Sequence, residues 1–120
     1  MEHLPILVNL KGKHCLVVGG GEEAANKADL LIRAGAILTV IAPHMSEAMR
    51  KHLSAGHIVW DIEQFSAEAM SHVPRPCFVV SVAENASINR AVARYCQQHH
   101  ILVSLLGERE QSNFLFFNED

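Results

Sequence analysis

The stretch that decides the fold is CLVVGGGEEAANK, residues 15–27. A short apolar run ends in three consecutive glycines, and a helical pattern begins at once. Gly19, Gly21 and Ala24 match the G-x-G-x-x-G/A spacing of a turn that binds dinucleotides. The first glycine permits the tight turn, and the second lets a pyrophosphate approach bare backbone. The small third residue lets the helix pack closely against the strand.

The start of the helix after this turn is a second reason to expect an anion there. Its first backbone N–H groups have no partners within the helix, and the helix dipole places positive charge at the same end. Together they attract a phosphate group. Glycine runs also make ordinary turns, so the position between a strand and a helix is what favours a nucleotide site. We therefore predict cofactor contacts at Gly19, Gly20 and Gly21.

The composition is that of one globular domain spanning residues 1–120, with 49% apolar and 19% charged residues. A net charge of -3 and the lack of any long basic run argue against nucleic acid or an anionic membrane as partner. No apolar stretch reaches the ~20 residues of a membrane span, and no signal peptide is recognisable. Three widely spaced cysteines without a C-x-x-C pair indicate reduced, mostly buried thiols in a cytoplasmic protein.

Short apolar runs alternate with helical patterns along the chain. Strands are predicted at 14–18, 37–42, from 58, 78–82 and 101–106, and helices at 22–34, 46–53 and 88–99, with a helical turn within 66–71. Right-handed crossovers from the glycine turn then give the strand order 3-2-1-4-5, with the third strand at an edge. The predicted fold class is α/β, a Rossmann-type three-layer fold with a parallel sheet and helices on both faces.

In such a sheet, ligands bind at the carboxyl ends of the strands where the strand order reverses. This places residues 19–23, 42–44, 81–85 and 105–108 around one crevice. NAD sites usually offer an acidic residue about 20 positions past the glycines. Here the second strand is followed by Pro43 and His44, without a carboxylate and without an arginine for a 2′-phosphate. The adenosine end of a dinucleotide would therefore be held by backbone and shape.

Eight histidines raise the question of a metal site. They include no i, i+4 pair on one predicted helix and no H-E-x-x-H sequence, so we predict no metal site. His44 is the exception to keep, because it lies at the predicted crevice and is placed to contact a cofactor or an acidic ligand.

The opening L-P-x-x-x-x-L at residues 4–10, followed by V-V-G-G-G-x-x-A-x-x-K at 17–27, resembles the N-terminal domain of siroheme synthase. The same module occurs alone as precorrin-2 dehydrogenase/sirohydrochlorin ferrochelatase. The likeness also includes residues 34–36, 42–43 and 88–92, and it covers roughly residues 4 to 114. These two motifs together are far more specific than G-x-G-x-x-G by itself.

The resemblance implies an enzyme that uses NAD to oxidise precorrin-2, a tetrapyrrole, to sirohydrochlorin. Many members also insert ferrous iron, which gives siroheme. The resemblance further implies NAD contacts at Glu22, Glu23, Pro43 and His44. Lys27 also matches the family pattern, and either a ligand contact or a solvated lysine fits that position.

One departure from the family concerns the chemistry directly. The fifth strand of the family usually ends N-V-V-D, and that aspartate is the proposed acid/base; here the position is Gly107. Glu108 is adjacent and is our candidate substitute, with a solvated turn glutamate as the alternative. Two functions therefore stay open: a precorrin-2 dehydrogenase, or a module that binds dinucleotide or tetrapyrrole without turnover.

The other departure is the end of the sequence, where the family continues into a helical dimerisation region that completes the tetrapyrrole cleft. Phe116 and Phe117 are then expected to be exposed at a sheet edge, which indicates a partner or a homodimer. The carboxylates of a tetrapyrrole would need basic partners, for which Lys27, Arg90 and Arg109 are the candidates.

Overall fold

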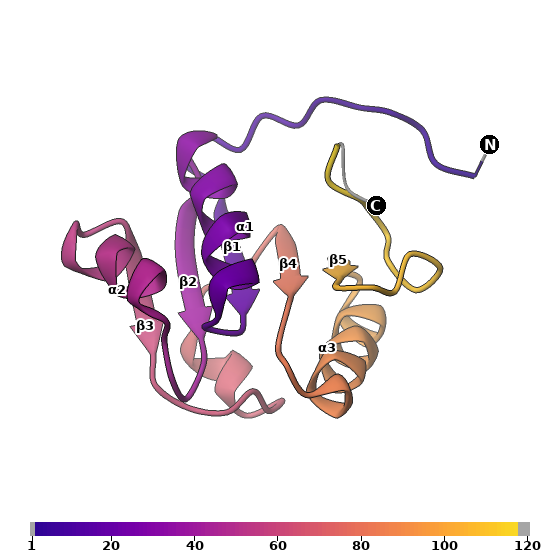
Figure 1. The fold of residues 1–120 in the computed structure, drawn as a ribbon. Helices are drawn as coiled ribbons and strands as arrows, with labels where there is room; N and C mark the ends of the chain where they lie inside the picture. The colour runs from indigo at the N-terminus through magenta and orange to yellow at the C-terminus, as the bar shows by residue number, and fades with distance from the viewer. Residues whose placement is uncertain (1, 118–120) are drawn as a thin grey trace.

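The computed structural model describes residues 2–117 and forms a parallel sheet with helices around it (Figure 1). Its elements, in chain order, are β1 His14–Val18, α1 Glu22–Arg33, β2 Ile37–Ile41, α2 Glu47–Ser54, β3 Ile58–Asp61, the 3-10 helix η1 Ala69–His72, β4 Phe78–Ser81, α3 Ala86–His99 and β5 Leu102–Leu105. The predicted strands and helices are confirmed, with boundaries that move by one or two residues. One such shift has a clear cause: α3 begins at Ala86 because the Asn85 side chain accepts a hydrogen bond from the Ser87 N–H.

The strand order is β3-β2-β1-β4-β5 with every neighbouring pair parallel, as predicted. Val18, the last residue of β1, is in register with Ile41 of β2 and Ser81 of β4. The carboxyl ends of the three central strands therefore finish at one level. The chain leaves β1 toward β2 on one side and returns to β4 on the other, so the order reverses beside β1.

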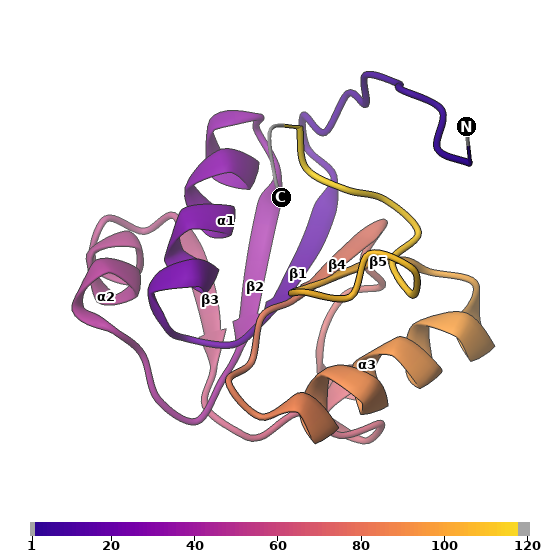
Figure 2. The ribbon, with the colours of Figure 1, turned by 45° about the vertical axis from the view of Figure 1, so that its right-hand side comes forward.

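Two apolar clusters cover the two faces of the sheet. On one face, α1 and α2 pack on alternate strand residues such as Val17 and Val40. On the other, η1 and α3 pack on Leu16 and Val79. Figure 2 shows α1 and α2 beside β1 to β3, and α3 beside β4 and β5. Because both faces are covered, the central strands are apolar without alternation.

Gly35 ends α1, as the sequence predicts. It has φ +89°, a left-handed conformation that favours glycine. The Gly35 N–H donates to the Ile32 carbonyl oxygen at 2.9 Å, and the Ala36 N–H donates to the Leu31 carbonyl oxygen at 3.1 Å. These two bonds satisfy carbonyls that would otherwise be left over at the helix end.

The segment after β5 folds back over the α1 side of the sheet, which corrects one prediction. Phe114 stacks on Phe78 of β4 with ring centroids 4.6 Å apart, and Phe116 lies 5.8 Å from Phe114. Phe116 is thus partly buried, and only Phe117 is exposed as predicted. The prediction was wrong for Phe116 alone, because Phe116 packs beside Phe114 against the core.

Lys27 is also not the solvated lysine that the sequence allowed. It is 9% exposed, and its Nζ atom lies 4.8 Å from the centroid of the Phe116 ring. A lysine stem covers apolar surface well, and a ring face attracts the ammonium group.

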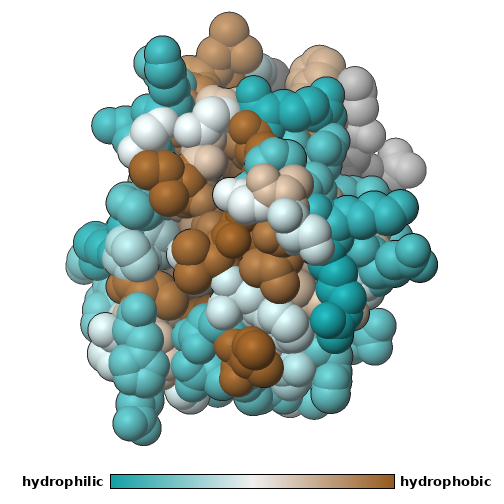
Figure 3. Space-filling model, turned by 90° about the vertical axis from the view of Figure 1, so that its left-hand side faces the viewer, coloured by the Kyte–Doolittle hydropathy of each residue, from teal (hydrophilic) through white to brown (hydrophobic). Residues whose placement is uncertain are grey.

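Exposed apolar side chains remain on the β3 side of the molecule, where Figure 3 shows them scattered between polar ones. Val59 on β3 and Ile62 just after it are exposed, as are Leu4 and Leu7 of the extended segment before β1. Among residues 2–117, no helix has the length and apolar character that crossing a membrane requires.

Candidate nucleotide site

A cavity of about 400 Å³ opens at the carboxyl ends of β1, β2 and β4, where the strand order reverses. It is lined by residues 18–21, 41–46, 64, 82–85 and 88. Three of the four segments predicted from the sequence contribute to it. The fourth, residues 105–108, does not line the cavity, because β5 lies one strand further from the reversal point.

The three glycines of the turn have three different surroundings. Gly19 has φ +126°, and a Cβ there would lie 2.8 Å from the Val82 carbonyl oxygen. A Cβ on Gly20 would collide with the carbonyl oxygen of His44. A Cβ on Gly21 would meet only the Glu84 Oε1 atom, at 3.7 Å. The packing of the chain itself therefore requires Gly19 and Gly20, whereas Gly21 leaves bare backbone open to the cavity.

Gly21 is also the N-cap of α1, and no side chain caps this helix. Its carbonyl oxygen accepts the first helical bond, from the Ala25 N–H at 3.0 Å. The preceding N–H groups of the first turn lie next to the wall that Gly21 forms, which is the arrangement that binds phosphate. Glu22 and Glu23, predicted as NAD contacts, are exposed in this turn and do not line the cavity.

The loop between β2 and α2 is fastened to the glycine turn. The Ser46 N–H donates to the Gly20 carbonyl oxygen at 2.7 Å, while the Ser46 hydroxyl oxygen accepts from the Met49 N–H and caps α2. This bond brings the predicted contacts Pro43 and His44 to the cavity, where both are exposed. The close approach of His44 to Gly20 is the reason that a middle glycine is needed.

A buried asparagine holds the third wall, and sequence reasoning assigned it no role. Asn89 on α3 is 9% exposed. Its Oδ1 accepts from the Ser81 hydroxyl at 2.6 Å and from the Ala83 N–H at 3.1 Å, and its Nδ2 donates to the Ala83 carbonyl oxygen at 2.9 Å. The sequence did contain a signal for this role, because Asn89 is a polar residue on the helix face that packs against β4.

The electrostatics of the cavity are acidic. Glu84 is the single carboxylate among the lining residues, and they include neither lysine nor arginine. Its Oε1 atom is also the nearest one to the open face of Gly21. A phosphate at the helix start would thus be attracted by backbone N–H groups and repelled by Glu84, and the exposed Glu22 and Glu23 of the first turn add to that repulsion.

Gly107 and Glu108 lie in the turn after β5 and are exposed. The Glu108 N–H donates to the Leu105 carbonyl oxygen at 3.2 Å, and its carbonyl oxygen accepts from the Ser112 hydroxyl at 2.7 Å. Gly107 has φ +74°, and nothing lies within 4 Å of the position its Cβ would take. The turn is therefore fixed, with the Glu108 side chain outside the cavity lining.

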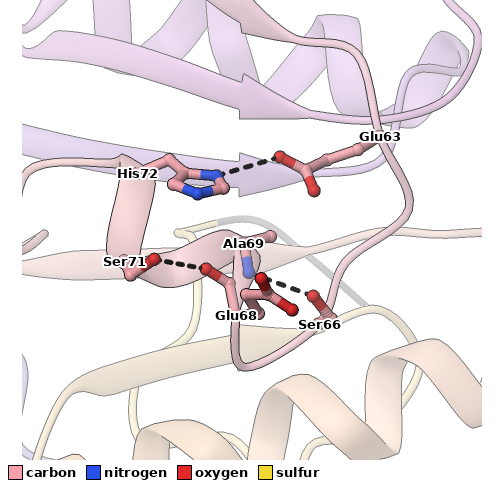
Figure 4. A network of polar contacts seen from close by, with 6 residues as sticks. All are labelled: Glu63, Ser66, Glu68, Ala69, Ser71 and His72. Atoms are coloured by element: carbon pink, nitrogen blue, oxygen red, sulfur yellow. Dashed lines mark hydrogen bonds and ion pairs between the residues drawn. The ribbon is translucent and has the colours of Figure 1, made fainter.

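A second polar cluster lies between the end of β3 and η1 and includes Asp61, Glu63 and His72. In Figure 4 the His72 ring on η1 faces Glu63, and the two are 3.5 Å apart from Nδ1 to Oε2. The ligand atoms of all three residues lie within 4.8 Å of one another. Two oxygens and one nitrogen could hold a divalent cation, yet the His72–Glu63 ion pair explains the arrangement without one.

Asp61 differs from the other two residues of this cluster. Its Oδ2 atom is buried without a hydrogen-bond partner among the described residues. Burial raises the pKa of Asp61 above its ordinary value, and the neighbouring Glu63 adds to the rise, while His72 acts in the opposite direction. Asp61 and Glu63 are two positions apart at the end of β3, whereas His72 comes from η1, so it is the approach of His72 that leaves no spacing signal in the sequence.

The fold and the glycine-lined cavity define a Rossmann domain of the NAD(P)-binding class. In agreement, residues 6–117 match the model of a family described as "Putative NAD(P)-binding", and the chain belongs to that family. It is a homologue of the N-terminal NAD-binding domain of siroheme synthase, as the resemblance implied.

The individual relatives fit this assignment. Siroheme synthase of Hydrogenovibrio crunogenus is 40% identical over 115 residues, covering 96% of this chain and 24% of the relative. That of Photorhabdus laumondii is 35% identical over 116 residues, with coverages of 97% and 24%. The chain thus spans about a quarter of the length of these relatives. The solved structure of SirC, precorrin-2 dehydrogenase, superposes on this chain with a TM-score of 0.78 and 23% identity. The match covers 95% of this chain and 54% of the SirC chain, and it confirms the fold.

Proposed function

We propose that this chain is an NAD-dependent precorrin-2 dehydrogenase domain of siroheme biosynthesis. Gly21 is the observation that carries the proposal. It forms an open stretch of backbone at an uncapped helix start, in the cavity where a Rossmann fold binds its dinucleotide. The siroheme synthase relatives support a tetrapyrrole as the substrate class.

In this proposal Gly21 would hold the pyrophosphate of NAD, and Pro43 and His44 would hold its adenosine end. Bound NAD supplies a hydride acceptor at C4 of its nicotinamide. The chain contributes orientation of the macrocycle and removal of a proton. Glu108 is the carboxylate next to the position of the family aspartate and is the proposed proton acceptor, although its side chain is exposed and outside the cavity lining.

Gly107 favours a second candidate function, in which the domain binds dinucleotide or tetrapyrrole without turnover. A glycine cannot accept a proton. The same acid/base would serve iron insertion. Sirohydrochlorin ferrochelatase activity, with ferrous iron as substrate, therefore requires a carboxylate at this position as well. Arg90 and Arg109 are exposed and stay candidates for the tetrapyrrole carboxylates. The proposal also includes that the protein is cytoplasmic and that it forms a homodimer.

Cofactor binding is tested by calorimetric titration of the purified chain with NAD, beside Gly21→Asp and Gly21→Ala. A Cβ on Gly21 meets only the Glu84 Oε1 atom, at 3.7 Å, so Gly21→Ala is expected to fold, whereas Gly21→Asp also adds a carboxylate beside Glu84. Gly21→Asp is expected to abolish binding, because its carboxylate takes the place of the pyrophosphate. Circular dichroism checks the fold of each variant. If NAD at millimolar concentration does not bind the unmutated chain, the dehydrogenase proposal is wrong and the fold stands.

Turnover is tested by the formation of NADH from NAD and precorrin-2. Gly107→Asp restores the family carboxylate, and Gly107→Asn is its matched control, because Asp and Asn both tolerate the left-handed backbone of this position. Activity that Gly107→Asp raises and Gly107→Asn does not would assign the unmutated chain to binding without efficient turnover. Activity of the unmutated chain that Glu108→Gln removes would support Glu108 as the proton acceptor.

A further inference from the structure

Two cysteines that are 62 positions apart in the sequence meet where β1 runs beside the start of β4. Cys15 belongs to β1, and Cys77 directly precedes β4. Their Sγ atoms are 3.9 Å apart. Cys15 is 2% exposed, whereas Cys77 is exposed. The third cysteine, Cys96, is buried in the cluster on the other face of the sheet and provides an internal control.

The backbone holds this pair in place on both sides. Cys15 is in register with Phe78, and the Cys77 N–H donates to the His14 carbonyl oxygen at 2.9 Å. Neighbouring strands lie about 4.8 Å apart, and a disulfide needs Cα atoms roughly 4.4–6.8 Å apart. Cys77 lies one residue off the position opposite Cys15, which keeps the pair near this range, and the sulfur atoms must close from 3.9 Å to about 2.0 Å to bond.

We propose that Cys15 and Cys77 form a site of oxidative modification that takes a small-molecule disulfide such as oxidised glutathione. The Cys77 thiolate attacks one sulfur of that disulfide, which gives a mixed disulfide and releases one glutathione thiolate. Cys15 then loses its proton and attacks the Sγ atom of Cys77, which expels the second glutathione thiolate. Two protein thiols are oxidised to one disulfide, and one glutathione disulfide is reduced to two thiols.

The two steps differ in rate for a physical reason. An oxidant reaches the exposed Cys77 directly, but Cys15 must ionise inside the core. In the reduced chain the pKa of Cys15 is raised to about 12, mainly by burial and further by the facing Cys77, while the Phe78 backbone N–H acts in the opposite direction. The attacking species is the thiolate, so the second step is slow near neutral pH and speeds up with pH.

The pair lies at the amino ends of β1 and β4, whereas the cavity lies at their carboxyl ends. A bond between Cys15 and Cys77 would therefore tie the two central strands together without touching the proposed NAD contacts. It closes a long loop, which raises the resistance of the chain to unfolding. This inference does not depend on the proposed function.

The test is incubation of the full chain with excess oxidised glutathione, followed by intact mass measurement and mapping of the linked peptides. A glutathione adduct at Cys77 is expected first, followed by a product that lacks the adduct and two hydrogens. The conversion is expected to speed up about tenfold per pH unit below the pKa of Cys15. The urea midpoint of the oxidised chain should exceed that of the reduced one.

Three variants make the outcome decisive. Cys77→Ser should give neither adduct nor intramolecular disulfide, and Cys15→Ala should stop at a stable adduct on Cys77. Cys96→Ser should behave like the unmutated chain. Adducts on Cys96, a disulfide between two chains, or an unmutated chain that stops at the Cys77 adduct at every pH would each overturn the proposal. Circular dichroism of Cys15→Ala distinguishes a stable adduct from loss of the fold.

Discussion

The side-chain amide of Asn89 makes two hydrogen bonds to the backbone of Ala83: its Oδ1 atom accepts from the Ala83 N–H, and its Nδ2 atom donates to the Ala83 carbonyl oxygen. A third bond joins Asn89 to the Ser81 hydroxyl. One side chain of α3 therefore fixes the chain at the point where it leaves β4. That point is a wall of the cavity, so the stability of the fold and the shape of the site depend on the same residue.

Replacement of Asn89 by alanine should cost about 2–3 kcal/mol of unfolding free energy, because buried polar partners lose their bonds. Asn89→Asp keeps the acceptor but sets a carboxylate oxygen against the Ala83 carbonyl oxygen in a buried site, so it should cost at least as much. Urea denaturation measures both losses. NAD titration should show weaker binding to Asn89→Ala than to the unmutated chain. A loss within about 0.5 kcal/mol, the range of an ordinary surface substitution, would contradict the assignment.

Alanine substitutions at the neighbouring glycines Gly20 and Gly21 should affect different properties, the stability of the fold and the binding of NAD. Gly20→Ala should destabilise the fold by about 1–3 kcal/mol, because its Cβ meets the His44 carbonyl oxygen and the loops must move apart. Gly21→Ala should stay within about 1 kcal/mol of the unmutated chain and yet weaken NAD binding. Thermal denaturation and calorimetry measure the two properties separately. Equal loss of stability at both positions would mean that Gly21 also has a packing role.

The fold could be predicted from the sequence because each of its determinants is local or general. The glycine turn marks the start of the first crossover, the short apolar runs mark buried strands, and the handedness of crossovers then fixes the order. The same rule predicted one crevice at residues 19–23, 42–44, 81–85 and 105–108, and the cavity is lined by parts of the first three segments but not by the fourth. These contacts follow from topology, so no side-chain detail was needed.

Side chains whose surroundings depend on distant segments could not be predicted in this way. The sequence left Lys27 open between a ligand contact and a solvated lysine, and the fold-back of Phe116 against it is what neither alternative anticipated. Asn89 was visible as a polar residue, but its partners depend on how α3 docks on β4. The proximity of Cys15 and Cys77 depends on the register of two strands and has no spacing signature.

Glu84 should weaken the binding of NAD, because its carboxylate lies where the pyrophosphate approaches Gly21. Glu84→Gln keeps the shape and removes the charge, so it should raise the affinity about 2- to 5-fold at low salt, the modest size expected of an exposed charge. The gain should shrink as salt screens the interaction. Glu110→Gln removes an exposed carboxylate that does not line the cavity, and should leave binding unchanged. A loss of affinity in Glu84→Gln would instead assign Glu84 to a cofactor contact.

Asp61 should reduce the stability of the fold at neutral pH. Its pKa is raised above the ordinary value of 3.8 in the folded chain, so folding favours the protonated form. Below pH 3.8 the carboxyl group is neutral in both the folded and the unfolded state and does not lower the unfolding free energy. The loss of unfolding free energy grows as the pH rises through the folded pKa and is complete above it.

Asp61→Asn cannot ionise and adds N–H donors beside Glu63. Its unfolding free energy should therefore exceed that of the unmutated chain at neutral pH, and the difference should narrow as the pH is lowered toward 3.8. Urea denaturation across this range measures the difference, with Glu68→Gln as the control for an exposed carboxylate nearby. A difference that does not change with pH would show that the effect comes from packing, because only an ionisable group makes it depend on pH.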